Sequence, residues 1–553
     1  MTPVHSSRRS FLLGAGAALL AAGCAPLVRS SGKRRHDLVL RGGTIFDGSG
    51  VEGVDGDLAI DGGRITEIGR GLADGAGEVV DVRGLAVSPG FIDIHSHADD
   101  TLFDDPRAES VVRQGVTTVI VGQDGSSSAP ARAASGAAGG DRSWVTTAQQ
   151  LAAVEALHGS VNLATMVGLG TVRAVVIGDE NRPATASELG RMVSLVERSL
   201  AEGACGASTG LEYTPGAFAS RSELIALCRP LAALRLPYAT HMRNEDDMLL
   251  DAVDEAIGVA TGASCPLQIS HLKTQGPRNW PKIEAVLERV ESAKRGGLDI
   301  AFDRYPYVAY QTGLSNLFPA TLRDGGTDAF LRRLADPSSA PSMRAAALAK
   351  VSLIGGWDNI MISAVKADAD RAAEGKRLGS YAASLGAEPY DVAVALLARS
   401  RGEVGMAGFA MSEANIARFL AHPLSMVCSD GGAFATDGPA HRGHPHPRGL
   451  GSFPRVLGSY VRERRVLTLA QAVHKMTGFP ASRARLSDRG RLAPGMVADV
   501  VVFDPATVHD RATFEQPFQY PEGIRLVVVN GQIALRDGSR GSVSSGRALR
   551  PST

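Results

Sequence analysis

The middle of the chain, from about residue 91 to 485, alternates short apolar runs with longer stretches of helical character. Short apolar runs bounded by turn residues are typical of buried strands. Strands that alternate with helices predict a parallel sheet, either closed or open. The strand candidates are 117–121, 237–240, 266–270, 300–303 and 424–428, and the helix candidates are 186–201, 248–260 and 280–294.

Both flanks of this region carry short strand-like runs separated by glycines, within residues 36–90 and 486–545. Neither flank is long enough to bury much apolar surface alone. We therefore expect one small β-sandwich domain assembled from both ends of the chain. The stretch 312–376 is rich in Ala, Arg and Asp and breaks the alternation, so we interpret it as a mostly helical insertion within the 91–485 region.

Histidines and carboxylates follow the predicted strands. His95 and His97 are separated by one residue, and side chains on a strand alternate, so both point to the same face. Such a pair is a good donor set for zinc-like metals. Functional residues of (β/α)₈ barrels lie at the carboxyl ends of strands, so residues in such positions converge at one mouth. Four further candidate ligands end apolar runs: Asp124, His241, His271 and Asp430.

The motifs around these residues resemble those of the D-aminoacylase branch of the amidohydrolase superfamily, the N-acyl-D-amino-acid deacylases. The resemblance extends over about 37–540 and implies a (β/α)₈ barrel, a terminal β-domain and a site for one or two divalent ions. Zinc is the expected metal, with Mn²⁺, Co²⁺ or Fe²⁺ as alternatives. The motifs are 95–97, 208–216, 238–245, 269–273, 303–307, 429–431, 444–448, 453–458, 476–480 and Asp499.

The same resemblance implies a role for each candidate ligand. His95 and His97 would hold one ion, and His241 and His271 would hold the other. Asp430 would contact metal and act as the acid/base that moves a proton between an activated water and the leaving amine.

The substrate would be held by residues that the family places around its carboxylate. Arg448 and Lys273 would grip the carboxylate, because Arg offers a planar fork of donors and Lys a compact positive charge. Tyr213 and Tyr305 would assist them. Packing roles for the two tyrosines and surface roles for the two cations remain open alternatives.

The chain departs from the family at two positions. Asp124 stands where this branch usually has a metal-bridging cysteine. A carboxylate can bridge two ions, or it can orient a ligating histidine instead. The predicted strand region 204–213 contains no lysine, so the carboxylated lysine of other amidohydrolases has no obvious position there.

The N-terminus, residues 1–35, resembles an export signal followed by a linker. Arg8-Arg9 precedes a mildly apolar stretch, as in twin-arginine signals, and Gly23-Cys24 resembles a lipoprotein cleavage site. We expect an exported protein of the periplasm or cell envelope, with Cys24 as the candidate lipidation site. An uncleaved anchor is the alternative, although the run 11–22 is short for a bilayer span.

The composition narrows the function classes. Lys plus Arg and Asp plus Glu number 58 each. The chain thus lacks the excess of basic residues that would indicate nucleic-acid binding. The leading hypothesis is hydrolysis of a small N-acyl-D-amino acid, or of a dipeptide with a C-terminal D-residue. A cyclic amide hydrolase of the dihydroorotase or hydantoinase kind, and a non-catalytic envelope lipoprotein with the same fold, are the alternatives. Membrane contact is expected only through the lipid anchor.

Overall fold

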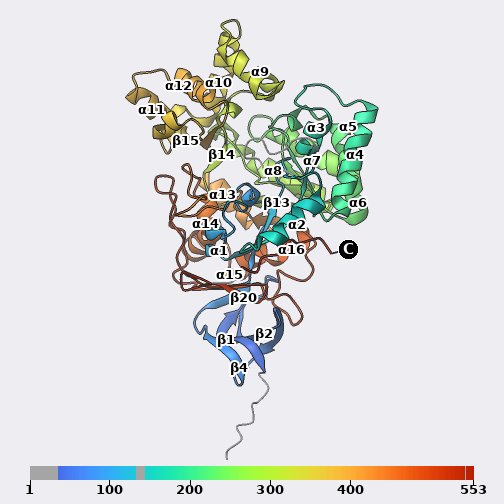
Figure 1. The fold of residues 1–553 in the computed structure, drawn as a ribbon, viewed down its shortest axis with the longest axis vertical. Helices are drawn as coiled ribbons and strands as arrows, with labels where there is room; N and C mark the ends of the chain where they lie inside the picture. Colours follow the sequence, from blue (N-terminus) through green and yellow to red (C-terminus); the bar gives the residue numbers. More distant parts are fainter. Residues whose placement is uncertain (1–34, 132–143, 542–543, 553) are drawn as a thin grey trace, which may run out of the picture.

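Figure 1 shows an elongated molecule with a sheet at one end and a group of helices at the other. The computed structural model describes residues 35–131, 144–541 and 544–552. An α/β body lies between the two ends and carries the site described below. The helices at the far end are α9 (Gly326–Ala335), α10 (Ala340–Ile354), α11 (Leu378–Ser384) and α12 (Pro389–Arg399).

The body contains two parallel sheets, with strand orders β6-β7-β8 and β17-β13-β12-β11-β10-β9. Their residues are all buried, as expected for parallel strands that are covered on both faces. The five strands predicted from apolar runs are confirmed as β7, β11, β12, β13 and β17. The bounds are β6 (Phe91–Asp93), β7 (Val116–Val121), β8 (Asn162–Thr165), β9 (Val167–Gly168), β10 (Ala207–Gly210), β11 (Tyr238–His241), β12 (Leu267–Ile269), β13 (Ile300–Arg304) and β17 (Ser425–Val427).

The three predicted helices are confirmed as α4 (Ala186–Ala201), α7 (Leu249–Ala263) and α8 (Ile283–Arg295). Helix α4 begins at a capping box, in which Thr185 and Glu188 satisfy each other's free backbone N–H groups. The other helices of the body are α1 (Glu109–Arg113), α2 (Thr147–Leu157), α3 (Leu169–Val176), α5 (Arg221–Cys228), α6 (Pro230–Leu234), α13 (Glu413–Ala421), α14 (Arg448–Arg455), α15 (Leu469–Met476) and α16 (Gly478–Arg483).

One nine-stranded sheet joins the two flanks of the chain, in the order β21-β20-β19-β18-β5-β1-β2-β3 with β4 beside β1. The two flanks meet where β5 pairs antiparallel with β18, with Val500 opposite Pro89. The bounds are β1 (His36–Ile45), β2 (Val54–Asp61), β3 (Arg64–Gly69), β4 (Ala76–Asp81), β5 (Ala86–Pro89), β18 (Val500–Phe503), β19 (Ile524–Val529), β20 (Gln532–Arg536) and β21 (Ser539–Arg540).

A buried polar network fixes this sheet against the body. The Asp499 carboxylate accepts hydrogen bonds from the Asn530 backbone N–H at 2.7 Å and from Asn162 Nδ2 of β8 at 3.0 Å. Arg489 Nη1 lies 2.5 Å from the same carboxylate. A buried charge is stable only when it is paired and hydrogen-bonded, so this network restricts how the sheet can sit on the body.

Between β13 and β17 the chain forms a small antiparallel sheet of β14 (Ala309–Gly313), β16 (Val404–Phe409) and β15 (Ile360–Val365). Helices α9 and α10 lie within the predicted helical stretch 312–376. The strand β15 in that stretch was not predicted, and the sheet extends the region on both sides. Its pairing, for example Tyr310 with Gly408, joins residues far apart in the sequence, and no local periodicity reveals such a contact.

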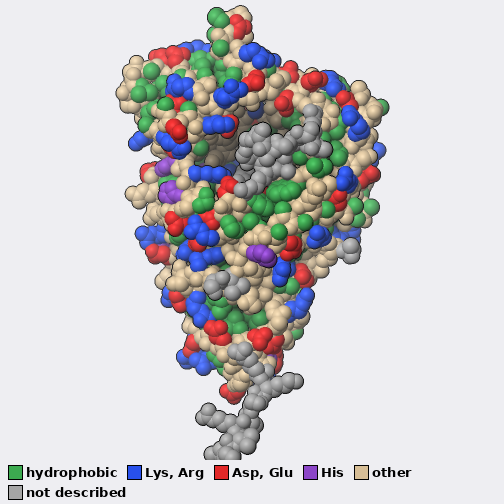
Figure 2. Space-filling view, viewed as in Figure 1, with side chains coloured by type: hydrophobic (Ala, Val, Ile, Leu, Met, Phe, Trp, Pro, Cys, Tyr) green, Lys and Arg blue, Asp and Glu red, His purple; other side chains and the backbone are tan. Residues whose placement is uncertain are grey.

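Figure 2 shows acidic and basic side chains interspersed over one face, which is hollowed below the α9–α12 group. Within the described ranges, no helix is both long enough and apolar enough to cross a membrane. Cys24 and Arg8-Arg9, which carry the export and lipidation predictions, lie outside the described residues.

Candidate active site

All six predicted ligands lie together at the carboxyl ends of five strands of the two parallel sheets. The chain places His95 and His97 just after β6, Asp124 after β7, His271 after β12 and Asp430 after β17, and His241 is the last residue of β11. All but His97 and Asp124 are fully buried. The structure therefore gathers the residues that the strand-end argument had selected.

Three of these residues have a left-handed backbone conformation. The φ angles are 52° at Asp124, 34° at His271 and 51° at Asp430. Residues other than glycine adopt positive φ at a cost of about 1–3 kcal/mol, and such residues concentrate at functional sites. Here each of these residues lies two or three positions beyond the end of a strand.

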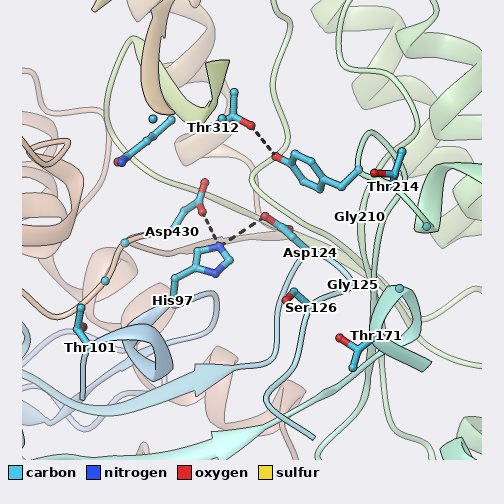
Figure 3. Close-up of a pocket in the computed structure, with 18 of the residues that line it drawn as sticks. His97, Thr101, Asp124, Gly125, Ser126, Thr171, Gly210, Thr214, Thr312 and Asp430 are labelled. Carbon is cyan, nitrogen blue, oxygen red and sulfur yellow. Dashed lines mark hydrogen bonds and ion pairs between the residues drawn. The ribbon is translucent and has the colours of Figure 1, made fainter. Parts of the chain in front are cut away.

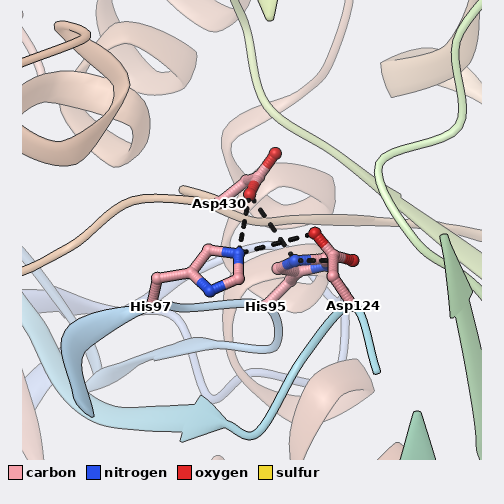
Figure 4. Close-up of side chains that lie close together, drawn as sticks. All are labelled: His95, His97, Asp124 and Asp430. Atoms are coloured by element: carbon pink, nitrogen blue, oxygen red, sulfur yellow. Dashed lines mark ion pairs between the residues drawn. The ribbon is translucent and has the colours of Figure 1, made fainter. Parts of the chain in front are cut away.

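The candidate ligands form two groups, and Asp124 is a member of both. Figure 4 shows the first group, in which His97 Nε2 lies 3.2 Å from Asp430 Oδ1 and 3.5 Å from Asp124 Oδ2. His95 Nε2 lies 3.5 Å from Asp124 Oδ1 and 3.6 Å from Asp430 Oδ1. In the second group, His271 Nε2 lies 3.4 Å from Asp124 Oδ1, and His241 Nδ1 lies 3.1 Å from His271 Nε2. Asp124 belongs to both groups.

These separations fit divalent ions. In a tetrahedral site with bonds of about 2.0–2.2 Å, neighbouring ligand atoms lie about 3.3–3.6 Å apart. Moreover, His95 Nε2 and Asp124 Oδ1 are buried without a hydrogen-bond partner. A buried polar atom without a partner is costly unless something else satisfies it. The donor set, imidazole nitrogens with carboxylate oxygens, is one that zinc and similar ions accept.

Arg448, at the start of α14, is the partner of Asp430. Its Nη1 donates to Asp430 Oδ2 at 2.6 Å, and both side chains are buried. Burial raises the pKa of Asp430, but the Arg448 guanidinium, His271 and His95 outweigh this effect and hold that pKa well below its usual range. Asp430 is therefore an ionised carboxylate with Oδ2 occupied and Oδ1 facing the histidines. His446 accepts the Arg448 backbone N–H at 3.0 Å and so helps to position Arg448.

The other predicted substrate contacts lie around the same centre. Tyr305 is fully buried, and its hydroxyl has no hydrogen-bond partner. Its ring lies 4.8 Å from the Arg448 guanidinium carbon and 6.0 Å from Lys273 Nζ. Lys273 is already paired, because both oxygens of Glu245 lie 2.6 and 2.7 Å from its Nζ. The Tyr213 ring lies 4.8 Å from the His241 ring.

Two pockets meet at the candidate metal ligands. The outer pocket has a volume of about 690 Å³, and Figure 3 shows His97, Asp124 and Asp430 on its wall. Arg448 also lines it. The inner pocket, lined by Lys273 and Tyr305 among others, has a volume of only about 20 Å³, enough for about one water. The outer pocket therefore offers the space for a substrate.

Three charged residues of the inner pocket were not predicted as site residues: Glu212, Glu245 and Lys350. Glu245 ends the motif 238–245, four residues after His241, and the sequence predicted no role for it. Glu212 Oε2 lies 3.6 Å from His241 Nε2. Lys350 arrives from α10 and donates to Asp246 Oδ2 and Gln275 Oε1 at 2.8 Å each. Nothing local in the sequence marks Lys350, because its position depends on how the 309–409 region docks.

Comparisons with known proteins identify the family of this chain. The sequence model of the amidohydrolase family matches residues 78–535. A D-aminoacylase from Alcaligenes xylosoxydans xylosoxydans is 37% identical over 94% of this chain and 98% of its own length. The crystal structure of an N-acyl-D-glutamate deacylase from Bordetella bronchiseptica, complexed with zinc and a phosphonate inhibitor, is 34% identical and superposes with a TM-score of 0.80 over 93% of this chain and all of that one.

A crystal structure of D-aminoacylase is 37% identical, with a TM-score of 0.79 over 93% of this chain. A D-hydantoinase is only 14% identical, with a TM-score of 0.53, and this likeness shows the fold alone. The gathered histidines and carboxylates and these relatives together place the chain in the class of metal-dependent hydrolases. The chain belongs to the amidohydrolase family, and within it to the D-aminoacylase group of N-acyl-D-amino-acid deacylases.

Proposed function

We propose that this protein hydrolyses the amide bond of N-acyl-D-amino acids, or of dipeptides with a C-terminal D-residue. The observation that carries the proposal is the placement of Asp430. It lies beside both histidines of the first ligand group, with one oxygen held by Arg448, and it faces the outer pocket. Three similar proteins are a D-aminoacylase, an N-acyl-D-glutamate deacylase and an N-acyl-D-aspartate deacylase, and this likeness supports the substrate class.

Asp430 supplies the proton transfer. Arg448 holds Oδ2, so Oδ1 is the atom that accepts a proton from the attacking water. The same oxygen then delivers the proton to the nitrogen of the leaving amine, which neutral hydrolysis requires. Because the side chain is buried, its position is fixed relative to the histidines.

The described residues fit one or two divalent ions, and Asp124, which belongs to both ligand groups, would help to hold each of them. His95, His97 and Asp430 would complete one position, and His241 and His271 the other. When bound, such an ion lowers the pKa of a water molecule towards neutrality and polarises the amide carbonyl.

We propose that Arg448, Lys273, Tyr213 and Tyr305 bind the substrate. Arg448 Nε is buried without a partner, and the Tyr305 hydroxyl is also without one. Both are donors near the ligands, where a carboxylate of the substrate can accept their hydrogen bonds. Lys273 contributes its charge from behind, since Glu245 holds its ammonium group.

A panel of substrates tests the function. Purified protein, its metal content measured, is assayed on N-acetyl-D-amino acids, their L-enantiomers, and the cyclic amides hydantoin and dihydroorotate. We expect turnover of D-substrates that depends on metal and is removed by a chelator. Preference for the cyclic amides would support the hydantoinase-like alternative, and metal binding without any turnover would support a non-catalytic role.

Replacing Arg448 with Ala is expected to weaken the use of substrates with a free α-carboxylate more than that of their carboxamides. The lost charge-assisted hydrogen bonds are worth about 1.5–3 kcal/mol, or about 10- to 150-fold in kcat/KM. Because Arg448 also holds Asp430, both substrate types should lose some kcat. The informative quantity is the ratio of kcat/KM for acid and carboxamide. An unchanged ratio would show that Arg448 only positions Asp430.

We propose that the two parallel sheets close into one eight-stranded barrel over 91–485, in which β8 and β9, separated by Met166 alone, count as one interrupted strand. Support comes from the Asp430 backbone N–H, which donates to His95 O at 2.9 Å, and from the Cys205 N–H, which donates to Thr165 O at 2.8 Å. These bonds connect the two sheets at both of their edges. A crystal structure with either edge open would contradict the barrel.

We further propose that residues 36–90 and 486–545 form a β-sandwich, with 312–376 as an insertion in the barrel. Leu40, Ile60, Val502 and Val528 share one apolar cluster, and this common core of the two flanks supports a packing of two layers. A crystal structure in which these side chains faced solvent would argue against two packed layers.

We also propose export through the twin-arginine route and lipidation at Cys24. Changing Arg8 and Arg9 to Lys should trap unprocessed precursor in the cytoplasm, as seen by fractionation. Changing Cys24 to Ala should abolish labelling by a radioactive fatty acid while leaving the released enzyme active. Labelling that persists in the Cys24 variant would refute the anchor.

A further inference from the structure

Glu245 is a buried carboxylate behind the second ligand group, on the side of His271 that faces away from Asp124. Its side chain is 3% exposed, and Oε1 lies 3.2 Å from His271 Nδ1. Oε2 lies 4.0 Å from His241 Nε2. The backbone carbonyl of Glu245 accepts the Gln275 N–H at 2.8 Å, which anchors the residue to the loop after β12.

His271 turns its two ring nitrogens to different neighbours. Nε2 faces Asp124 Oδ1 at 3.4 Å and His241 Nδ1 at 3.1 Å, which is the side on which an ion would lie. Nδ1 faces away from that side, towards Glu245 and Lys273. A neutral imidazole that binds metal through Nε2 must carry its proton on Nδ1, and the group that accepts this proton's hydrogen bond fixes the tautomer.

Two groups compete for Nδ1 of His271. Lys273 Nζ lies 2.7 Å from this nitrogen and can only donate a hydrogen bond. The Glu245 carboxylate can only accept one when ionised. A bond from Lys273 would place the imidazole proton on Nε2, towards the ion, whereas a bond to Glu245 keeps Nε2 free. Glu245 also takes up the Lys273 ammonium with both oxygens, which offers that donor another partner.

We propose that Glu245 is a positioning residue that keeps the proton of His271 on Nδ1 and so prepares Nε2 to bind metal. This inference rests on the metal site of the proposed function, but not on the amide chemistry. In this arrangement Lys273 serves chiefly to neutralise the buried Glu245, and it reaches the substrate only through its charge. Glu245 itself touches neither substrate nor ion.

The test compares zinc affinities, measured by competition with a chromophoric chelator. Glu245→Gln should weaken zinc binding by about 10- to 100-fold, the usual effect of losing a carboxylate behind a ligating histidine. Adding Lys273→Met to Glu245→Gln should recover much of the loss, because the competing donor is gone and the amide oxygen can still accept from Nδ1. Glu245→Gln with unchanged affinity, or a double variant as weak as the single one, would overturn the proposal.

A matched control comes from another buried pair. Arg173 Nη1 donates to the two carboxylate oxygens of Glu223, at 2.6 and 2.7 Å. Glu223 is buried like Glu245 and contacts no histidine of the site. Glu223→Gln should lower the melting temperature but leave zinc affinity unchanged. If it lowers zinc affinity as much as Glu245→Gln does, loss of a buried ion pair explains both effects and the proposal is wrong.

The wild-type protein gives a test that needs no folded variant. In the cobalt-substituted enzyme, an exchangeable N–H resonance of His271 shifted by the metal is expected in H₂O and should vanish in D₂O. Its absence, with cobalt bound, would show that Nδ1 carries no proton. If the wild type binds neither zinc nor cobalt, the proposed metal site itself is wrong. That outcome differs from a site that binds metal with an affinity independent of Glu245, which would contradict only the present inference.

Discussion

Asp430→Asn is expected to reduce amide hydrolysis by about 10²- to 10⁴-fold, the range that general acid–base catalysis contributes. Asparagine can neither accept the proton from water nor return it to the leaving amine. The fold should be preserved, because the amide is of the same size and can still bond to Arg448. Metal content should stay nearly intact, since His95, His97 and Asp124 remain in the first ligand group.

The measurement is kcat on an N-acetyl-D-amino acid, together with metal analysis and circular dichroism of the same preparation. Asp93→Asn serves as a comparison, because Asp93 is buried close to the site but is bonded to Ser429 rather than placed at the pocket. We expect a smaller loss for Asp93→Asn. Near wild-type turnover in the Asp430 variant would rule out the acid/base assignment.

Asp124→Ala is expected to remove at least one equivalent of bound metal and nearly all activity. Asp124 belongs to both ligand groups, with Oδ1 near His95 and His271 and Oδ2 near His97 and His241. Its removal therefore takes a carboxylate from both candidate ligand groups of the described residues. The measurement is metal per chain after dialysis, by mass spectrometry.

Asp124→Cys separates a bridging ligand from a carboxylate that only orients a histidine. Thiolate is a softer donor than carboxylate, so a bridging cysteine should retain metal and shift the preference towards Zn²⁺ over Mn²⁺. Wild type should accept Mn²⁺, Co²⁺ or Fe²⁺ more readily than this variant does. Unchanged stoichiometry and unchanged preference in both Asp124 variants would show that Asp124 does not touch the ions.

The strand-end residues could be selected from the sequence because their position follows from local pattern. An apolar run fixes the strand, and a parallel topology brings the carboxyl ends together, so His241 and His271 had to lie near each other once both strands were identified. The same reasoning could not supply Glu245 with a role. It lies beyond the end of β11, and its contact with His271 depends on the loops after two neighbouring strands.

Contacts between residues far apart in the chain could not be predicted from the sequence. The pairing of Arg448 with Asp430 is one such contact. The family resemblance had assigned Arg448 to the substrate carboxylate and Asp430 to the metal and the proton, so it did not suggest that the two side chains bind each other. Lys350 enters the inner pocket from a helix of the region that departs from the barrel pattern. Burial of charged groups in ion pairs follows from tertiary packing, and residue periodicity does not encode it.

The pairing of β5 with β18 has a consequence for biosynthesis. As the chain leaves the ribosome, β5 emerges long before β18, its antiparallel neighbour, has been made. Until then, one edge of β5 has unpaired backbone groups that can capture a strand of another nascent chain. The sheet at this end of the molecule can thus be completed only after β18 has left the ribosome, so folding helpers that shield exposed strand edges should matter most in that interval.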